Sequence, residues 1–239
     1  MNNIDWIFFD VGGVLLDDTA AMQEQRTLML EILHTVNPRL TLKDIESIQP
    51  ELSKNPRGLM SNTIAYFSPD EETGDRLIKE FKERFPSTRY NELSMLRPEA
   101  LKTISNLRER YQLGLTGNQP HATIEKLQEV GILEYFHHQK VSAHYGFTKP
   151  DPRFFKAVLE DVGTDPTRSV VVDDNIERSL IPAKELGMTT VWYKLEERST
   201  PENVIDYTIT SLTDLGDFLG GWYPNHLFYV WNCRLCWKT

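Results

Sequence analysis

The feature of this sequence that most constrains its fold is a short apolar run that leads directly into an acid. Large apolar side chains fill residues 6–9, Asp10 follows them, and Gly12 and Gly13 come next but one. A continuous apolar run of this kind is typical of a strand that is buried on both faces of a parallel sheet. Ligands of open α/β sheets bind beyond the carboxyl ends of the strands, so Asp10 is a candidate site residue.

Composition narrows the class of protein. A chain of 239 residues is long enough for one α/β domain with an insertion. The 35 acidic and 26 basic residues disfavour a nucleic-acid partner, because phosphate backbones bind basic surfaces. Two cysteines give no disulfide framework, the N-terminus lacks a secretion-signal pattern, and no apolar run approaches the ~20 residues that span a bilayer. We therefore expect a cytoplasmic monomer or homodimer with no membrane partner.

The remaining sequence divides into two regions with different patterns of expected secondary structure. From about residue 20 to residue 91 the pattern is helical and is interrupted by prolines. From about residue 96 onward, helical segments alternate with short runs typical of strands, at 112–115, 140–143, 169–172, 189–192 and 207–210. This alternation predicts βαβ units in a doubly wound, mostly parallel α/β sheet that carries a helical insert after its first strand.

Five polar residues fall at or just after the ends of the predicted strands: Asp10, Thr116, Lys149, Asp173 and Asp174. The carboxyl ends of parallel strands lie along one edge, so these residues are expected to converge. A carboxylate can attack phosphorus, and neighbouring carboxylates suit Mg²⁺. A hydroxyl and a lysine can hold a phosphoryl group and offset its charge. Adjacent acids at a buried edge repel one another unless a cation joins them.

The order of four motifs resembles the haloacid dehalogenase-like (HAD) hydrolase superfamily over about residues 6–219. The motifs are Asp-x-x-Gly-x-Leu from residue 10, Thr-Gly-Asn at 116–118, Lys-Pro-Asp-Pro at 149–152 and Val-Val-Asp-Asp at 171–174. The resemblance implies a Rossmann-like core at 1–18 and 93–220, with the helical cap of the first subfamily at 19–92. Residues 221–239 then form an additional aromatic-rich tail.

The resemblance also implies a role for each matching residue. Asp10 would be the nucleophile that forms an aspartyl-phosphate, with Lys149 beside it in the catalytic set. The implied substrate-binding residues are Thr116, Gly117, Asn118 and Lys149, and the implied Mg²⁺ ligands are Asp10, the Gly12 carbonyl, Asp174 and Asp173. The expected activity is a Mg²⁺-dependent phosphatase acting on a small phosphorylated metabolite.

The sequence departs from this family at Gly12. Most phosphatases of the family have a second acid there, which protonates the leaving group and then activates water; Ser179 likewise replaces a further acid. The loss of a general acid and base is worth ~10²–10⁴ in rate. We therefore expect alkyl phosphates to react slowly, the aspartyl-phosphate to be long-lived, and Gly12→Asp to raise turnover. Asp17, Asp18 or a cap residue are open candidates for replacing the acid.

Two other functions remain open at the level of sequence. A 2-haloacid dehalogenase uses the same nucleophile, although the family's dehalogenases have an aromatic residue where Gly12 stands, and chloride release tests this alternative. A non-catalytic or regulatory protein on the same fold is favoured by Gly12 and disfavoured by the intact Asp10, Lys149 and Asp174. The CxxC spacing of Cys233 and Cys236 is a weak zinc signal without further ligands.

Overall fold

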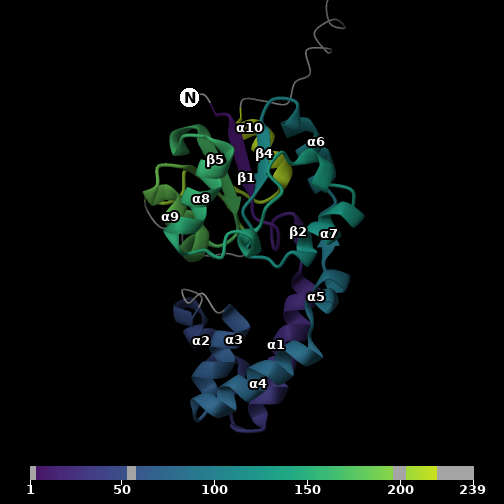
Figure 1. Ribbon diagram of the computed structural model, residues 1–239, viewed down its shortest axis with the longest axis vertical. Helices are drawn as coiled ribbons and strands as arrows, with labels where there is room; N and C mark the ends of the chain where they lie inside the picture. Colours follow the sequence, from purple (N-terminus) through teal and green to yellow (C-terminus); the bar gives the residue numbers. More distant parts are fainter. Residues whose placement is uncertain (1–3, 53–57, 196–202, 220–239) are drawn as a thin grey trace, which may run out of the picture.

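The structure is a computed structural model that describes residues 4–52, 58–195 and 203–219. The predicted tail at 221–239, including Cys233 and Cys236, lies outside the described residues. Figure 1 shows a larger body built on a sheet and a second body made of helices at one end of it. No helix in the described part of the chain is long and apolar enough to cross a membrane.

The larger body contains one five-stranded sheet in the order β4-β1-β5-β6-β7. Its strands are β1 (Trp6–Phe9), β4 (Gln112–Leu115), β5 (Ser169–Asp173), β6 (Thr189–Tyr193) and β7 (Tyr207–Ile209). Every neighbouring pair is parallel. The first strand therefore lies inside the sheet, flanked by strands that come more than 100 residues later. The predicted α/β class with a mostly parallel, Rossmann-like sheet is confirmed.

Alternate residues of the strands pack against different helix layers. Phe9 and Val172 face one core, which α6 (Ala100–Arg108), α7 (Ala122–Glu129) and α10 (Leu215–Phe218) complete. Phe8, Val171 and Trp192 face the other core, which α8 (Pro152–Val162) and α9 (Ile181–Glu185) complete. Because both faces are covered, β1 is apolar at every position, and β5 is apolar at residues 170–172 between Ser169 and Asp173.

In the described part of residues 19–93, the second body is built from five helices with a core of their own. These are α1 (Thr19–His34), α2 (Leu42–Leu52), α3 (Leu59–Phe67), α4 (Glu71–Arg84) and α5 (Ser87–Leu93). The chain enters and leaves this body through β2 (Leu16–Asp17) and β3 (Met95–Leu96), which pair antiparallel. We refer to α1–α5 as the cap helices; the boundaries 19–92 remain a prediction.

The connecting loops contain the remaining short elements. They are the 3₁₀ turns η1 (Leu133–Tyr135), η2 (Ser142–His144), η3 (Pro166–Arg168) and η5 (Leu212–Asp214) and the π-helical turn η4 (Ile176–Leu180). The predicted strand at 140–143 is wrong, since the chain forms η2 there. The backbone N–H of Ser142 donates to the Gly117 carbonyl at 3.0 Å, and its hydroxyl accepts from the Gln119 N–H at 3.1 Å. These contacts outweigh local strand propensity.

Candidate active site

The register of the sheet brings three of the predicted site residues to one level. Asp10, Thr116 and Asp173 come directly after residues that pair with one another across β1, β4 and β5. The backbone N–H of Asp10 donates to the Val172 carbonyl at 3.0 Å, and that of Thr116 donates to the Phe9 carbonyl at 2.9 Å. Asp10 therefore lies at the centre of the carboxyl edge, between the other two.

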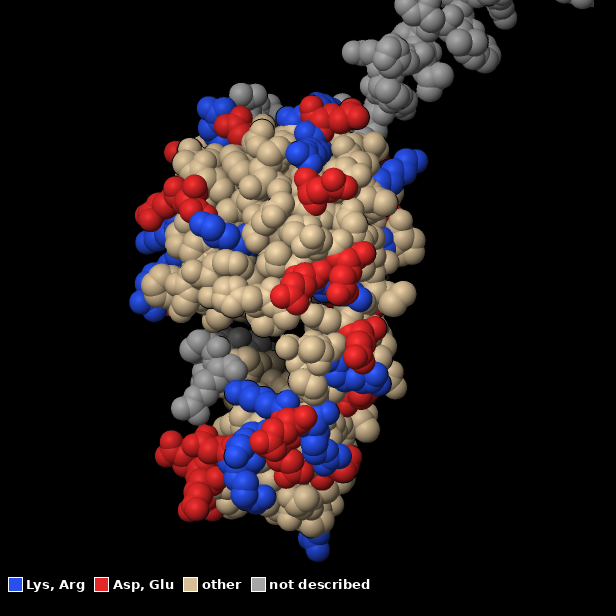
Figure 2. Space-filling model, turned by 45° about the vertical axis from the view of Figure 1, so that its right-hand side comes forward, with Lys and Arg blue, Asp and Glu red and all other residues tan. Residues whose placement is uncertain are grey.

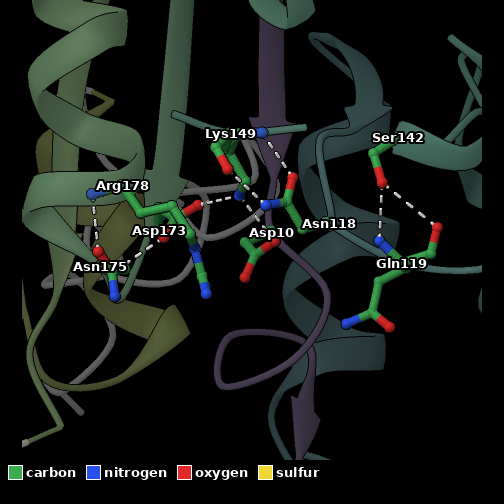
Figure 3. A network of polar contacts seen from close by, with 8 residues as sticks. All are labelled: Asp10, Asn118, Gln119, Ser142, Lys149, Asp173, Asn175 and Arg178. Carbon is green, nitrogen blue, oxygen red and sulfur yellow. Dashed lines mark hydrogen bonds and ion pairs between the residues drawn. The ribbon is translucent and has the colours of Figure 1, made fainter. Parts of the chain in front are cut away.

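Lys149 joins this group from the loop before α8. Its ammonium donates to Oδ1 of Asp10 at 2.9 Å and to Oδ2 of Asp173 at 2.6 Å (Figure 3). The Lys149 side chain is completely buried. Asn118 holds the backbone of this loop, because its Oδ1 accepts from the Lys149 N–H and its Nδ2 donates to the Lys149 carbonyl, both at 2.8 Å. A buried lysine between two carboxylates fixes the direction of both acids.

The three residues at 116–118 that were predicted to bind substrate differ in their surroundings. The Thr116 hydroxyl is buried and has no hydrogen-bond partner among the described residues, so it is able to bond a ligand. Gly117 is tightly packed: a Cβ there would lie 2.9 Å from Cγ of Gln119 and 3.0 Å from a methyl carbon of Val11. The amide of Asn118 bonds the Lys149 backbone through both its oxygen and its nitrogen. The structure thus gives the Asn118 side chain a positioning task, and its contact with substrate stays a prediction.

Three acids form a cluster suited to a hard cation. One carboxylate oxygen from each of Asp10, Asp173 and Asp174 lies within 4.8 Å of the other two. Asp173 is otherwise engaged, since it accepts from Lys149 and, at 2.9 Å, from the Asn175 N–H. Oδ1 of Asp174 is buried without a hydrogen-bond partner in the described part of the chain. Asp10 and Asp174 therefore offer oxygen ligands of the kind that Mg²⁺ prefers.

The glycine turn after β1 lies directly against Asp174. Gly13 has a positive φ of 79°, which favours glycine, and a Cβ there would lie 2.5 Å from Oδ2 of Asp174. No larger residue fits at this position while the carboxylate stays in place. The turn that contains Gly12, whose carbonyl is the predicted fourth ligand, is therefore held against the acid cluster.

Burial and charge separate the pKa values of these groups. Burial raises the pKa of Asp10, and it raises the pKa of Asp174 well above the usual range with the help of the neighbouring acids. Burial also opposes ionisation of Asp173, but the charges of Lys149 and Arg178 outweigh it and lower its pKa. The pKa of Lys149 is raised, because the two carboxylates outweigh its burial. The cluster holds more acid than its cations balance, so a divalent cation fits it.

Arg178 is a residue of the site that the sequence analysis missed. It lies on η4, where its N–H donates to Oδ1 of Asn175 at 2.8 Å. Figure 3 shows its guanidinium directed toward the space beside Asp10. Burial lowers its pKa, but the charges of Asp10, Asp173 and Asp174 outweigh that effect and raise it. The available signal was its position within one helical turn of the acid pair.

Comparison with known families identifies the protein family of this chain. The family model of haloacid dehalogenase-like hydrolases matches residues 4–187, which is well over half of the chain. The chain belongs to the haloacid dehalogenase-like hydrolases. The match confirms the family that the four motifs of this HAD hydrolase predicted.

Individual relatives extend the match to nearly the full chain. The HAD hydrolase is 26% identical over 230 residues to the glyceraldehyde 3-phosphate phosphatase of Pyrococcus furiosus, covering 92% of this chain and 94% of the relative. It is 24% identical over 225 residues to the pyrimidine 5′-nucleotidase YjjG of Escherichia coli, covering 90% and 97%. The crystal structure of a HAD phosphatase from Thermococcus onnurineus superimposes with a TM-score of 0.64 at 23% identity, covering 91% and 99%.

Proposed function

We propose that this HAD hydrolase is a metal-dependent phosphatase that releases inorganic phosphate from a small phosphorylated metabolite. The observation that carries the proposal is the convergence of Asp10, Lys149 and the two further acids at one edge of the sheet. Relatives named as phosphatases of glyceraldehyde 3-phosphate and of pyrimidine nucleotides support the same class of reaction.

In the proposed reaction Asp10 is the nucleophile. One of its carboxylate oxygens attacks the substrate phosphorus, the bond from phosphorus to the leaving oxygen breaks, and an aspartyl-phosphate forms on Asp10. Water then attacks that phosphorus, and the bond to Asp10 breaks to return the free carboxylate. Lys149 offsets the charge that gathers on the transferring group, and the unpartnered Thr116 hydroxyl is placed to donate to one of its oxygens.

The acid cluster supports Mg²⁺ as the metal in this proposal. Asp10, Asp174 and the Gly12 carbonyl supply hard oxygens, and Asp173 is the outer member because Lys149 and the Asn175 N–H already occupy its carboxylate. When bound, the ion would neutralise charge on the phosphoryl oxygens. Lys149 and Arg178 add positive charge to the same site.

A panel of phosphate esters tests the proposal. Phosphate release is measured with and without Mg²⁺ on glyceraldehyde 3-phosphate, pyrimidine 5′-nucleotides and p-nitrophenyl phosphate, with Asp10→Asn as the matched variant. We expect Mg²⁺-dependent release that Asp10→Asn abolishes. Equal release by the variant contradicts the nucleophile, and chloride release from 2-haloacids without any phosphate release contradicts the reaction class.

A further inference from the structure

The space beside Gly12 is filled by a carboxylate from elsewhere in the chain. A Cβ on Gly12 would lie 2.8 Å from Oδ2 of Asp18, 2.8 Å from the hydroxyl of Tyr90 and 3.2 Å from Nε2 of Gln119. Two of these separations are shorter than real Cβ atoms tolerate. A side chain at residue 12 would therefore enter the position that the Asp18 carboxylate already holds. This side of the site therefore contains an acid, Asp18, although residue 12 is a glycine.

Contacts from the cap helices hold the Asp18 carboxylate in this place. The Tyr90 hydroxyl donates to Oδ2 of Asp18 at 2.5 Å, and the Gln119 amide hydrogen-bonds the same hydroxyl. Asp18 directly precedes α1, while Tyr90 lies on α5, so the two residues come from the two ends of the cap insert. The carboxylate is thus anchored where the cap meets the sheet.

Helix capping does not explain the orientation of Asp18. Aspartate is a common N-cap residue because its carboxylate usually accepts from the first backbone N–H groups of a helix. Asp18 is the N-cap residue of α1, yet its side chain makes no capping hydrogen bond. The neighbouring Asp17 takes that task, since its Oδ1 accepts from the N–H of Thr19 at 3.0 Å and from its hydroxyl at 2.6 Å. The Asp18 side chain is free to turn toward Gly12.

The pair formed by Asp18 and Tyr90 lies within the electrostatic reach of the nucleophile. The pKa of Tyr90 is raised by its burial first, then by the charge of Asp18, and also by the charge of Asp10. Tyr90 therefore stays protonated and continues to donate to Asp18. Gly12 is two residues from Asp10, so the Asp18 carboxylate occupies the side-chain space of a residue in the same turn as the nucleophile.

We propose that Asp18 is the general acid and base of this hydrolase, positioned by Tyr90, in place of the acid that residue 12 lacks. The inference rests on the proposed phosphatase function. In the first step Asp10 attacks phosphorus, the bond to the leaving oxygen breaks, and the Asp18 carboxyl gives that oxygen its proton. In the second step the Asp18 carboxylate takes a proton from the attacking water as the phosphorus bond to Asp10 breaks. Asp18 then holds a proton for the next cycle.

Rapid-mixing kinetics of Asp18→Asn, with Asp17→Asn as the matched control, test the proposal in the presence of Mg²⁺. p-Nitrophenolate leaves without protonation, so Asp18→Asn is expected to release one equivalent per active site in a burst. Steady turnover then falls by ~10²–10⁴, because water lacks its base. With an alkyl phosphate the burst is lost as well. Asp17→Asn is expected to match the wild type on both substrates.

Tyr90→Phe tests the positioning role separately. Its expected defect has the same preference for p-nitrophenyl phosphate over the alkyl phosphate, but it is only about tenfold, the loss expected for one hydrogen bond. The proposal is overturned if Asp18→Asn keeps wild-type turnover of alkyl phosphates, or if it loses the p-nitrophenolate burst. A substrate bias in Tyr90→Phe that Asp18→Asn lacks would assign the proton to Tyr90 and also overturn it.

The Asp10→Asn variant separates failure of this inference from failure of the proposed function. Loss of both burst and turnover in Asp10→Asn, combined with wild-type behaviour of Asp18→Asn, refutes the role of Asp18 alone. Full turnover by Asp10→Asn refutes the phosphatase mechanism itself.

Discussion

The ammonium of Lys149 lies 2.9 Å from a carboxylate oxygen of Asp10, although 139 residues separate them in the chain. The parallel sheet makes this contact possible, since Asp10 and Asp173 lie at its carboxyl edge and the loop of Lys149 follows His138, which bridges in parallel to Gly114 of β4. The same ammonium also binds Asp173, so one buried cation fixes two buried acids. The chemistry of the site and the stability of the core therefore depend on the same group.

Lys149→Met is expected to destabilise the protein severely. Removal of one partner from a buried ionic group leaves the remaining charges unpaired, which typically costs about 3–5 kcal/mol. Lys140→Met is the matched control, because Lys140 pairs with Asp161 at 2.7 Å on the surface with its side chain 46% exposed, where such pairs contribute about 1 kcal/mol or less. Urea unfolding measures both. Equal costs for the two variants would contradict the buried network.

The two adjacent acids are expected to respond in opposite directions to neutralisation. Without metal, Asp174→Asn relieves repulsion from Asp10 and Asp173 and should raise the free energy of unfolding by on the order of 1 kcal/mol. Asp173→Asn removes a partner of Lys149 and should lower it by about 3–5 kcal/mol. Metal-free thermal unfolding distinguishes them, and a loss of stability in both variants contradicts this assignment.

Mg²⁺ is expected to stabilise the wild type but not Asp174→Asn. A ligand at 100 times its dissociation constant adds about 2.7 kcal/mol to a folded state that alone binds it. Asp174 supplies an oxygen that has no hydrogen-bond partner among the described residues, so its neutralisation should remove most of that gain. Thermal shift with increasing MgCl₂, against a NaCl series of equal ionic strength, is the measurement. An equal rise of the unfolding temperature in Asp174→Asn would show that Mg²⁺ binds at a site without Asp174.

Gly12→Asp is now expected to lower turnover, which reverses the expectation from sequence. The new side chain would displace Asp18 and Tyr90, because the Cβ alone would lie 2.8 Å from an oxygen of each. Combined with Asp18→Ala, which clears that space, Gly12→Asp should restore part of the turnover that Asp18→Ala alone loses. Steady-state rates on an alkyl phosphate measure all three variants. A gain of turnover in Gly12→Asp alone would contradict the close packing of Asp18 and Tyr90 against Gly12.

The sequence predicted most of the fold and the positions of the main site residues. The continuous apolar runs of β1 and β5 are unambiguous, and the acids that follow them reach the same edge once the strands pair in parallel. The strand predicted at 140–143 failed because Ser142 is held by Gly117 and Gln119, residues that are distant in sequence.

The choice among the candidates for the acid missing at Gly12 could not be made from the sequence, for a physical reason. The sequence left Asp17, Asp18 and a cap residue as candidates for the missing acid, and the structure shows that Asp17 caps α1 while Asp18 turns toward Tyr90. Arg178 was missed likewise, because its approach to Asp10 depends on the π-helical turn at Ile176–Leu180. Contacts between side chains far apart in sequence decide both cases.

The most direct test of the account is to identify the residue that becomes phosphorylated during turnover. Acid quenching of Asp18→Asn during reaction with p-nitrophenyl phosphate and Mg²⁺, followed by peptide mass spectrometry, locates the modification. The account predicts one phosphoryl group on Asp10, and none when Asp10→Asn is added to the same variant. A phosphoryl group on another residue, or its persistence when Asp10 is replaced, would contradict the account.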